Sequence, residues 1–300
     1  MNNPKLWLFA ALVVVNLAFV AGWVRAARRR TVVPAPPSLT DIGIGALTDF
    51  LDGLGIGSFA PTTALYKLRR NPRDELIPGT LNVGHNASAF IETVVFVTVV
   101  AVDPVLLVSI IGAATLGAWL GAGVVNRLPR TGIQLFMGGA LLIAGAFFVM
   151  ANLGAFPAGG EALGLAGWHF GLAVGVCFVL GALMSVGIGC YAPMMVLLYL
   201  LGLNPLAAYP IMMGSCGLIQ PVASLRFFRS GRFAFGPSLG LTIGGVAGVL
   251  VAIFVVRKLP LHLLRWLVAV VVAYAAISML HSALTERRQN RTAAVRPLTL

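Results

Sequence analysis

Two runs of the chain combine glycine, proline and one polar or sulfur-containing side chain inside long apolar segments. They are residues 55–61 (GIGSFAP) and 187–193 (GIGCYAP). Glycine and proline interrupt a helix, and an interrupted helix in a bilayer leaves backbone N–H and C=O groups without partners. Because unpaired groups are costly in hydrocarbon, each break is expected to line a polar cavity inside the protein.

The chemistry that these breaks offer is anion binding by backbone amides. A helix is expected to start after each break, near Ser58 and near Cys190, and helix N-termini carry free N–H groups with partial positive charge. Ser58 is a preferred N-cap residue, and Pro61 and Pro193 suit a first helical turn. We expect the substrate contacts to come from Gly57, Ser58, Phe59 and Ala60 at the first break and from Gly189, Cys190, Tyr191 and Ala192 at the second.

Neutral polar side chains follow each break. Their positions are Thr62, Asn82 and His85 in the first half and Ser215 and Cys216 in the second. Hydroxyl and amide groups can bind an oxyanion, although each of these side chains also fits ordinary helix–helix hydrogen bonding, worth about 0.6 kcal/mol. Asn82 and His85, spaced to share one helix face, are the strongest candidates.

Three acids, Asp49, Asp52 and Glu92, lie within apolar sequence. A carboxylate inside a membrane is a functional candidate by default. We assign Asp49 and Asp52 to coupling, with two interpretations left open. Either they are protonated or coupled to a proton or cation, or they pair with a basic group such as Lys67 or Arg69.

The acids have no counterparts in the second half, where Gly181 and Met184 align with Asp49 and Asp52. The predicted site is therefore asymmetric. No spacing of Cys, His and Asp matches a metal cage, so neither a metal nor a cofactor is expected.

Composition places the chain in a membrane. Of its 300 residues, 59% are hydrophobic and only 10% are charged, and the mean hydropathy is +0.94. The net charge of +12 comes from basic residues in short loops, which indicates the positive-inside rule and argues against nucleic-acid binding. The three cysteines lie in apolar segments, which argues against a disulfide framework.

A spanning helix needs about 20 apolar residues. The expected spans are 6–24, 80–101, 104–125, 132–151, 208–228, 236–256 and 261–281. The broken segment 40–68 is too short on each side of its break to cross twice, so it is predicted to be a re-entrant hairpin. Whether the second broken segment, 169–201, crosses fully is left open.

The two halves of the chain correspond at an offset of 132, and seven of the 14 positions in 55–68 are identical to those in 187–200. Each half contains one hairpin and three spans, an odd number, which predicts an all-α inverted-topology repeat with an additional N-terminal helix. The expected units are 1–37 (N-terminal helix and basic Pro-rich linker), 38–151 (first repeat), 152–284 (second repeat) and 285–300 (tail).

The distribution of basic residues predicts the orientation of the chain. A hairpin at 40–68 puts the basic clusters before and after it on one face, while the loops 152–167 and 202–207 carry no Lys or Arg. The N-terminus is therefore expected outside and the C-terminus in the cytoplasm. The expected location is the bacterial inner membrane.

Residues 48–63 and 78–85, together with 189–193 and 210–216, resemble the TauE/SafE family of sulfite and organosulfonate exporters. The N-terminal helix, 6–24, is not counted as part of this pattern. The resemblance implies an anion permease, not an enzyme, that exports a sulfur-containing oxyanion by alternating access. Besides that substrate and the bilayer, a proton and a second copy of the chain are kept as partners.

Three alternatives remain. The first is uptake of a reduced sulfur compound such as thiosulfate, with Cys190 and Cys216 as soft contacts. The second is an intramembrane hydrolase with Ser58 as nucleophile and His85 as base. The third is a purely structural membrane protein.

Overall fold

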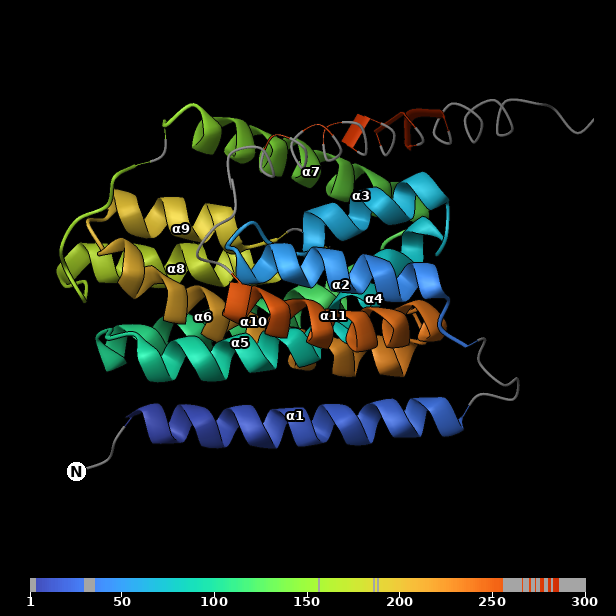
Figure 1. Cartoon of the computed structure of the whole chain (residues 1–300), viewed down its shortest axis with the longest axis horizontal. Coiled ribbons are helices and arrows are strands. Elements are labelled where there is room, and N and C mark those ends of the chain that lie inside the picture. Colours follow the sequence, from blue (N-terminus) through green and yellow to red (C-terminus); the bar gives the residue numbers. More distant parts are fainter. Residues whose placement is uncertain are drawn as a thin grey trace, which may run out of the picture.

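The computed structural model describes residues 4–29, 36–155, 157–185, 187, 189–255 and scattered positions between 266 and 285. Within these residues the chain is helical, without an extended strand. The helices are α1 (Pro4–Arg28), α2 (Leu39–Gly53), α3 (Phe59–Arg69), the 3-10 turn η1 (Asp74–Leu76), α4 (Ile77–Gly84), α5 (Asn86–Val99), α6 (Pro104–Val125), α7 (Arg130–Asn152), α8 (Gly167–Met184), α9 (Tyr191–Leu200), α10 (Pro205–Ser230) and α11 (Phe235–Val255). They lie roughly parallel or antiparallel to one another (Figure 1).

Six helices of the described part are long and apolar enough to cross a bilayer. They are Lys5–Arg28, Pro104–Val125, Arg130–Asn152, Gly167–Met184, Pro205–Ser230 and Phe235–Ile253. The prediction of an all-α, multi-pass membrane protein is therefore confirmed. The expected span 261–281 lies largely outside the described residues.

The prediction of one continuous span at 80–101 is wrong. His85 ends α4 and also precedes α5, so two shorter helices meet there. The hydroxyl of Thr242 on α11 donates to the Gly84 carbonyl at 2.9 Å. A tertiary partner thus satisfies a backbone group at the junction, and the weak helix formers Gly84, His85 and Asn86 favour the interruption.

Both predicted breaks are present, and at each of them the chain doubles back. From the first break, α3 returns toward the end of the bundle where α2 begins, and α9 likewise returns toward the end where α8 begins (Figure 1). Gly55, Gly57 and Gly187 have φ of 78°, 93° and 98°. Residues with a Cβ rarely adopt these backbone angles, which explains why the turns contain glycine.

Small residues set the closest helix contacts. Gly244 and Gly248 of α11 face the backbone of α2 at Ile42 and Ala46, and a Cβ at either glycine would clash. Gly117 and Gly121 of α6 similarly face Phe178 and Ala182 of α8. Glycines allow backbones to approach closely, which favours helix association in a membrane.

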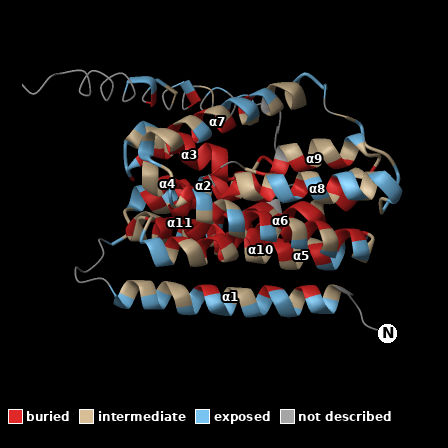
Figure 2. Ribbon diagram, turned by 180° about the vertical axis from the view of Figure 1, so that it is seen from behind, coloured by how far each residue is buried: buried red, intermediate tan, exposed pale blue. Residues whose placement is uncertain are grey.

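The centre of the bundle is formed by α10, while α1 lies at its edge. In the most apolar stretch of α10, 83% of the residues are buried, compared with 17% for α1. Figure 2 shows the same contrast, with buried residues concentrated in the inner helices.

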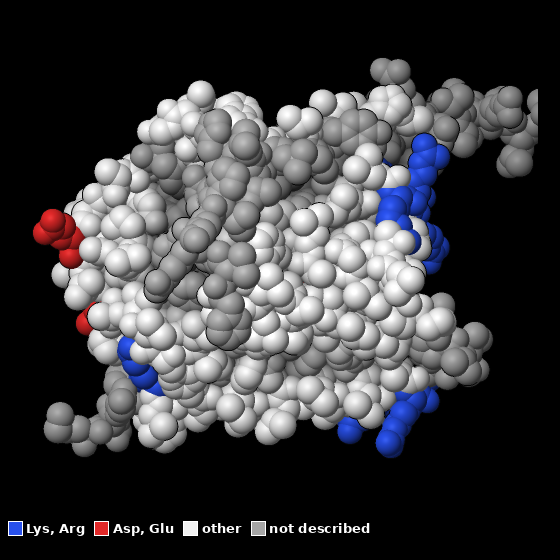
Figure 3. Space-filling view, in the orientation of Figure 1, with Lys and Arg blue, Asp and Glu red and all other residues white. Residues whose placement is uncertain are grey.

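The exposed charged side chains differ between the two ends of the molecule. On the face shown in Figure 3, most of the Lys and Arg side chains gather at the end where α1 terminates, and the acidic side chains lie at the opposite end. At the basic end, Lys67 pairs with Asp74 at 2.9 Å and Arg69 pairs with Asp41 at 2.7 Å. These ion pairs join α3 to η1 and to the first turn of α2.

Candidate functional site

The two breaks lie against each other. A Cβ added to Gly57 would be 3.9 Å from the Cβ of Tyr191, and one added to Gly189 would be 3.8 Å from the Cβ of Phe59. Both breaks line one cavity of ≈ 30 Å³. The remaining part of the cavity wall comes from α7, through Ala140, Ile143 and Ala144, and these three residues were not predicted from the sequence to belong to the site.

The helices that follow the breaks begin without side-chain caps. Ser58 and Cys190 occupy the N-cap positions of α3 and α9, but neither side chain bonds to its helix. The Ser58 hydroxyl instead donates to Oδ2 of Asp52 at 2.7 Å. Ser58 therefore has the predicted position but not the predicted capping bond. The side chain of Ala192 lies outside the described residues.

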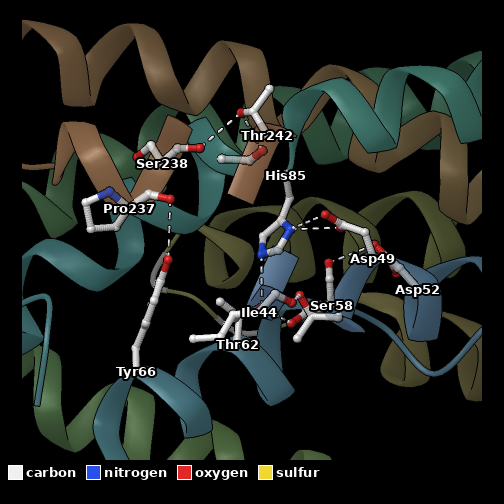
Figure 4. Close-up of polar contacts among 12 residues, drawn as sticks. Ile44, Asp49, Asp52, Ser58, Thr62, Tyr66, His85, Pro237, Ser238 and Thr242 are labelled. Carbon is white, nitrogen blue, oxygen red and sulfur yellow. Dashed lines mark hydrogen bonds and ion pairs between the residues drawn. The ribbon is translucent and has the colours of Figure 1, made fainter. Parts of the chain in front are cut away.

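A buried chain of polar contacts lies beside the first break (Figure 4). Nδ1 of His85 is 2.8 Å from Oδ1 of Asp49, and Nε2 of His85 is 3.0 Å from the hydroxyl of Thr62. The same hydroxyl donates to the Ser58 carbonyl at 2.8 Å. All of these side chains are buried, and the ring of Phe59 lies 5.7 Å from that of His85.

The hydrogen-bond arrangement around His85 depends on the Thr62 hydroxyl, which has one hydrogen and two acceptors within reach. These acceptors are the Ser58 carbonyl and Nε2 of His85. If that hydrogen goes to the Ser58 carbonyl, Nε2 of His85 donates to Thr62, and the proton between Nδ1 and Asp49 can be carried by either group. If it goes to His85, the ring is neutral and Nδ1 donates to Asp49. Rotation of one hydroxyl therefore allows Nε2 of His85 to act either as a donor or as an acceptor.

The interpretation that Asp49 and Asp52 pair with Lys67 or Arg69 is wrong. Those basic residues pair with Asp74 and Asp41. Asp49 lies eight residues beyond Asp41 on α2, which is about 12 Å further along the helix axis. The carboxyls of Asp49 and Asp52 are therefore too deep for basic groups at the rim.

Glu92 on α5 is a third acid near the first break, although only Asp49 and Asp52 were assigned to coupling from the sequence. Its side chain is fully buried, and neither of its oxygens has a hydrogen-bond partner in the described part of the chain. A Cβ added to Gly53 would lie 3.6 Å from its Oε1. Glu92 therefore lies against the end of α2, beside the first break.

Sulfur atoms surround the second break. The Sγ of Cys190 lies 3.3 Å from Sδ of Met184 and 3.7 Å from Sγ of Cys216. The hydroxyl of Tyr191 contacts Sδ of Met213. Ser58 and Asp52 are the sequence equivalents of Cys190 and Met184, so the second half has a sulfur contact where the first half has an oxygen contact.

Two predicted site residues use their hydrogen bonds within their own helices. Asn82 donates to the Pro78 carbonyl at 2.8 Å, and Ser215 donates to the Ile211 carbonyl at 2.7 Å. Neither residue lines the cavity between the breaks. Asn82 and His85 also differ in role, because only His85 belongs to the polar chain at Asp49.

The Ser58–His85 pair that a hydrolase would require is not formed. Ser58 donates to Asp52, and the two ring nitrogens of His85 face Asp49 and Thr62. The described geometry therefore lacks a nucleophile held by its base.

Long apolar helices around a sealed polar centre define a multi-pass helical membrane protein. Residues 3–148 match the model of the family described as sulfite exporter TauE/SafE, which confirms the resemblance found in the sequence. The match begins at residue 3, so it includes α1, which the sequence analysis set apart from the family pattern. No curated protein and no solved structure matches the chain.

Proposed function

We propose that the protein exports a small sulfur-containing oxyanion, sulfite or an organosulfonate, across the bacterial inner membrane by alternating access. The observation that carries this proposal is the meeting of the two breaks around one cavity, which is lined by Gly57, Phe59 and Ala60 of the first break and by Gly189, Tyr191 and Pro193 of the second. The match of residues 3–148 to a sulfite exporter family supports the choice of substrate class.

The anion is held by backbone amides at the two breaks. The helices α3 and α9 begin there without side-chain caps, so their first N–H groups and helix dipoles are available to a negative ligand. The residues lining the cavity include no Lys or Arg. The site would therefore bind an anion without a buried cation, as discontinuous helices do in other transporters.

Transport requires the breaks to separate. A cavity of ≈ 30 Å³ holds little more than water, so an oxyanion enters only when α3 and α9 move apart. The glycines with positive φ at both breaks supply the flexible points. The described arrangement then corresponds to the closed step of the cycle.

An inverted repeat accounts for the pairing of helices. Ala46 contacts Gly248, and Phe178 contacts Gly117 in an equivalent way. Phe178 lies 132 positions after Ala46, and Gly248 lies 131 positions after Gly117. The two hairpins also open toward opposite ends of the bundle (Figure 1). Re-entrant hairpins related in this way would alternate access around a fixed midpoint.

The orientation of the chain follows from its charges. We place the basic end of the bundle, where α1 terminates, in the cytoplasm and the N-terminus outside. A membrane potential that is negative inside favours anion exit by ~2.3 kcal/mol per charge per 100 mV. Asp49, Asp52 and Glu92 would add a proton to the cycle where this driving force is insufficient.

Proteoliposomes loaded with sulfite or a sulfonate test the proposal. We expect efflux that a negative internal potential accelerates and that protein-free liposomes lack. Ala144→Phe, which fills the cavity, should abolish efflux, whereas Leu142→Phe, on the exposed side of the same helix, should not. Absence of movement for sulfite and for all sulfonates tested would refute the proposal.

A second candidate is uptake of thiosulfate, and the sulfur contacts at the second break favour it. Cys190, Cys216 and Met184 present polarisable atoms to the region of the break. Radiolabelled thiosulfate offered outside the same proteoliposomes would separate the two functions.

A further inference from the structure

A second hollow lies away from the breaks, between α1 and α10 near the basic end of the bundle. Its volume is ≈ 460 Å³. Arg25 and Arg29 of α1 and Arg229 of α10 line it, together with alanines of α1 and with Leu225 and Phe228. It therefore combines a strongly basic part with an apolar part.

The three arginines lie on two helix faces that border the same space. Arg25 lies in the last turn of α1, and Arg29, directly after this helix, donates its backbone N–H to the Arg25 carbonyl at 3.1 Å, so the two residues share one face. Arg229 lies in the last turn of α10. All three arginines line the hollow, where guanidinium groups can bind phosphate oxygens, and the Arg229 guanidinium also lies 6.0 Å from the ring centroid of Trp119.

These positive charges are not neutralised by acids. In the described part of the chain, no ion pair involves Arg25, Arg29 or Arg229, whereas Lys67, Arg69, Arg73 and Arg130 at the same end all pair with carboxylates. The residues lining the hollow include no Asp or Glu. The hollow therefore has a net attraction for an anion.

The apolar part of the hollow is held in place by aromatic packing. The ring of Phe19 on α1 lies 5.4 Å from that of Phe228 on α10. A Cβ added to Gly22 would come 2.9 Å from Phe228, so the helices already touch at this level. Beyond that contact, the alanines of α1 are too small to fill the space against Leu225, which leaves an apolar groove leading from the arginines.

We propose that this hollow binds an anionic glycerophospholipid. The phosphate headgroup lies among Arg25, Arg29 and Arg229, and an acyl chain runs along the groove between α1 and α10. Basic pockets between membrane helices bind acidic lipid headgroups in this way. Inorganic phosphate would satisfy the arginines but not the groove, which is why the occupant is a lipid.

Native mass spectrometry of the purified full-length protein tests this proposal, with phosphatidylglycerol, phosphatidylcholine and inorganic phosphate as separate probes. We expect a retained phosphatidylglycerol adduct on the natural chain. The triple variant Arg25→Gln/Arg29→Gln/Arg229→Gln should bind it on the order of 100-fold more weakly, because each surface arginine contributes roughly a five-fold preference for anionic lipid. Ala21→Leu, which fills the groove without changing charge, should also weaken binding.

The matched control is Arg28→Gln/Arg70→Gln/Arg127→Gln, which removes the same charge from exposed positions outside the hollow. It should bind phosphatidylglycerol as the natural chain does. Equal loss in the control, equal retention of phosphatidylcholine, or full retention by the triple variant would overturn the proposal. Binding of inorganic phosphate as tight as that of the lipid would also overturn it.

Discussion

Nδ1 of His85 lies 2.8 Å from Oδ1 of Asp49, and neither side chain exposes any surface. The pair joins the end of α4 to the middle of α2. Gly245 of α11 lies behind it, and a Cβ at that position would collide with Asp49 Oδ2. A charged or proton-sharing pair is thus enclosed by three helices beside the first break.

We predict that Asp49→Asn and His85→Gln each strongly reduce sulfite efflux from proteoliposomes. Each change replaces one member of the carboxylate–imidazole pair with an amide, which can still hydrogen-bond the remaining partner but cannot exchange a proton with it. Size-exclusion profiles of the purified variants would show whether the fold is retained.

Glu161→Gln, at an exposed position in the loop between α7 and α8, is the control and should transport normally. Full efflux by a folded Asp49→Asn variant would show that the pair is only structural.

A second prediction concerns the space that Gly245 leaves for Asp49. Gly245→Ala should lower stability by about 1–3 kcal/mol, the usual cost of overpacking. Thermal unfolding in detergent measures the effect. Gly175→Ala, where an added Cβ has nothing within 4 Å, is the control and should unfold like the natural chain.

The proposed inverted repeat predicts how this damage can be repaired. The sequence equivalent of Asp49 is Gly181 in the second half, and that of Gly245 is Ala114 in the first half; these two residues are also in contact. The double variant Asp49→Gly/Gly245→Ala recreates that pair, and we expect it to recover stability without recovering transport. If it is no more stable than Gly245→Ala alone, the two contacts are not equivalent.

A third prediction tests whether the breaks must separate. In a background without the native cysteines, Phe59→Cys and Gly189→Cys should form a disulfide with copper phenanthroline as oxidant. Their Cβ atoms would be 3.8 Å apart, within the ~3.5–4.5 Å range of disulfides. The cross-linked protein should not transport, and reduction with dithiothreitol should restore efflux.

The single variants Phe59→Cys and Gly189→Cys, treated with the same oxidant, control for effects of the substitutions. Undiminished flux through fully cross-linked protein would contradict the proposed motion of α3 and α9.

A fourth prediction separates the two candidate substrates. Cys190→Ser/Cys216→Ser should retain sulfite efflux, because a hydroxyl already occupies the equivalent position, Ser58, in the first half. Any thiosulfate uptake should be lost, since the soft sulfur contacts are removed. Cys177→Ser, a change of another buried cysteine, is the control. Thiosulfate uptake that survives in the double variant would exclude a role for these thiols.

Sequence periodicity and composition correctly predicted the membrane class, both helix breaks and most of the spans, since each is encoded locally. A run of about 20 apolar residues or a Gly-Ile-Gly…Pro interruption needs no distant partner to be recognised. The break at His85 was not predicted because it depends partly on a hydrogen bond from Thr242 of α11, which lies 158 positions away from Gly84 in the sequence. The failure to pair Asp49 with His85 has a similar cause, as the two lie 36 positions apart.

The chain by itself determined that two interrupted helices would lie within a membrane and that buried acids would accompany the first of them. Only the tertiary structure decided which groups meet. Packing of α2 against the glycines of α11 fixes the depth of Asp49, and the turn at His85 brings the imidazole to it. The physical reason is that hydrogen bonds and close glycine contacts are selected by three-dimensional proximity, whereas hydropathy and helix breaking act along the chain.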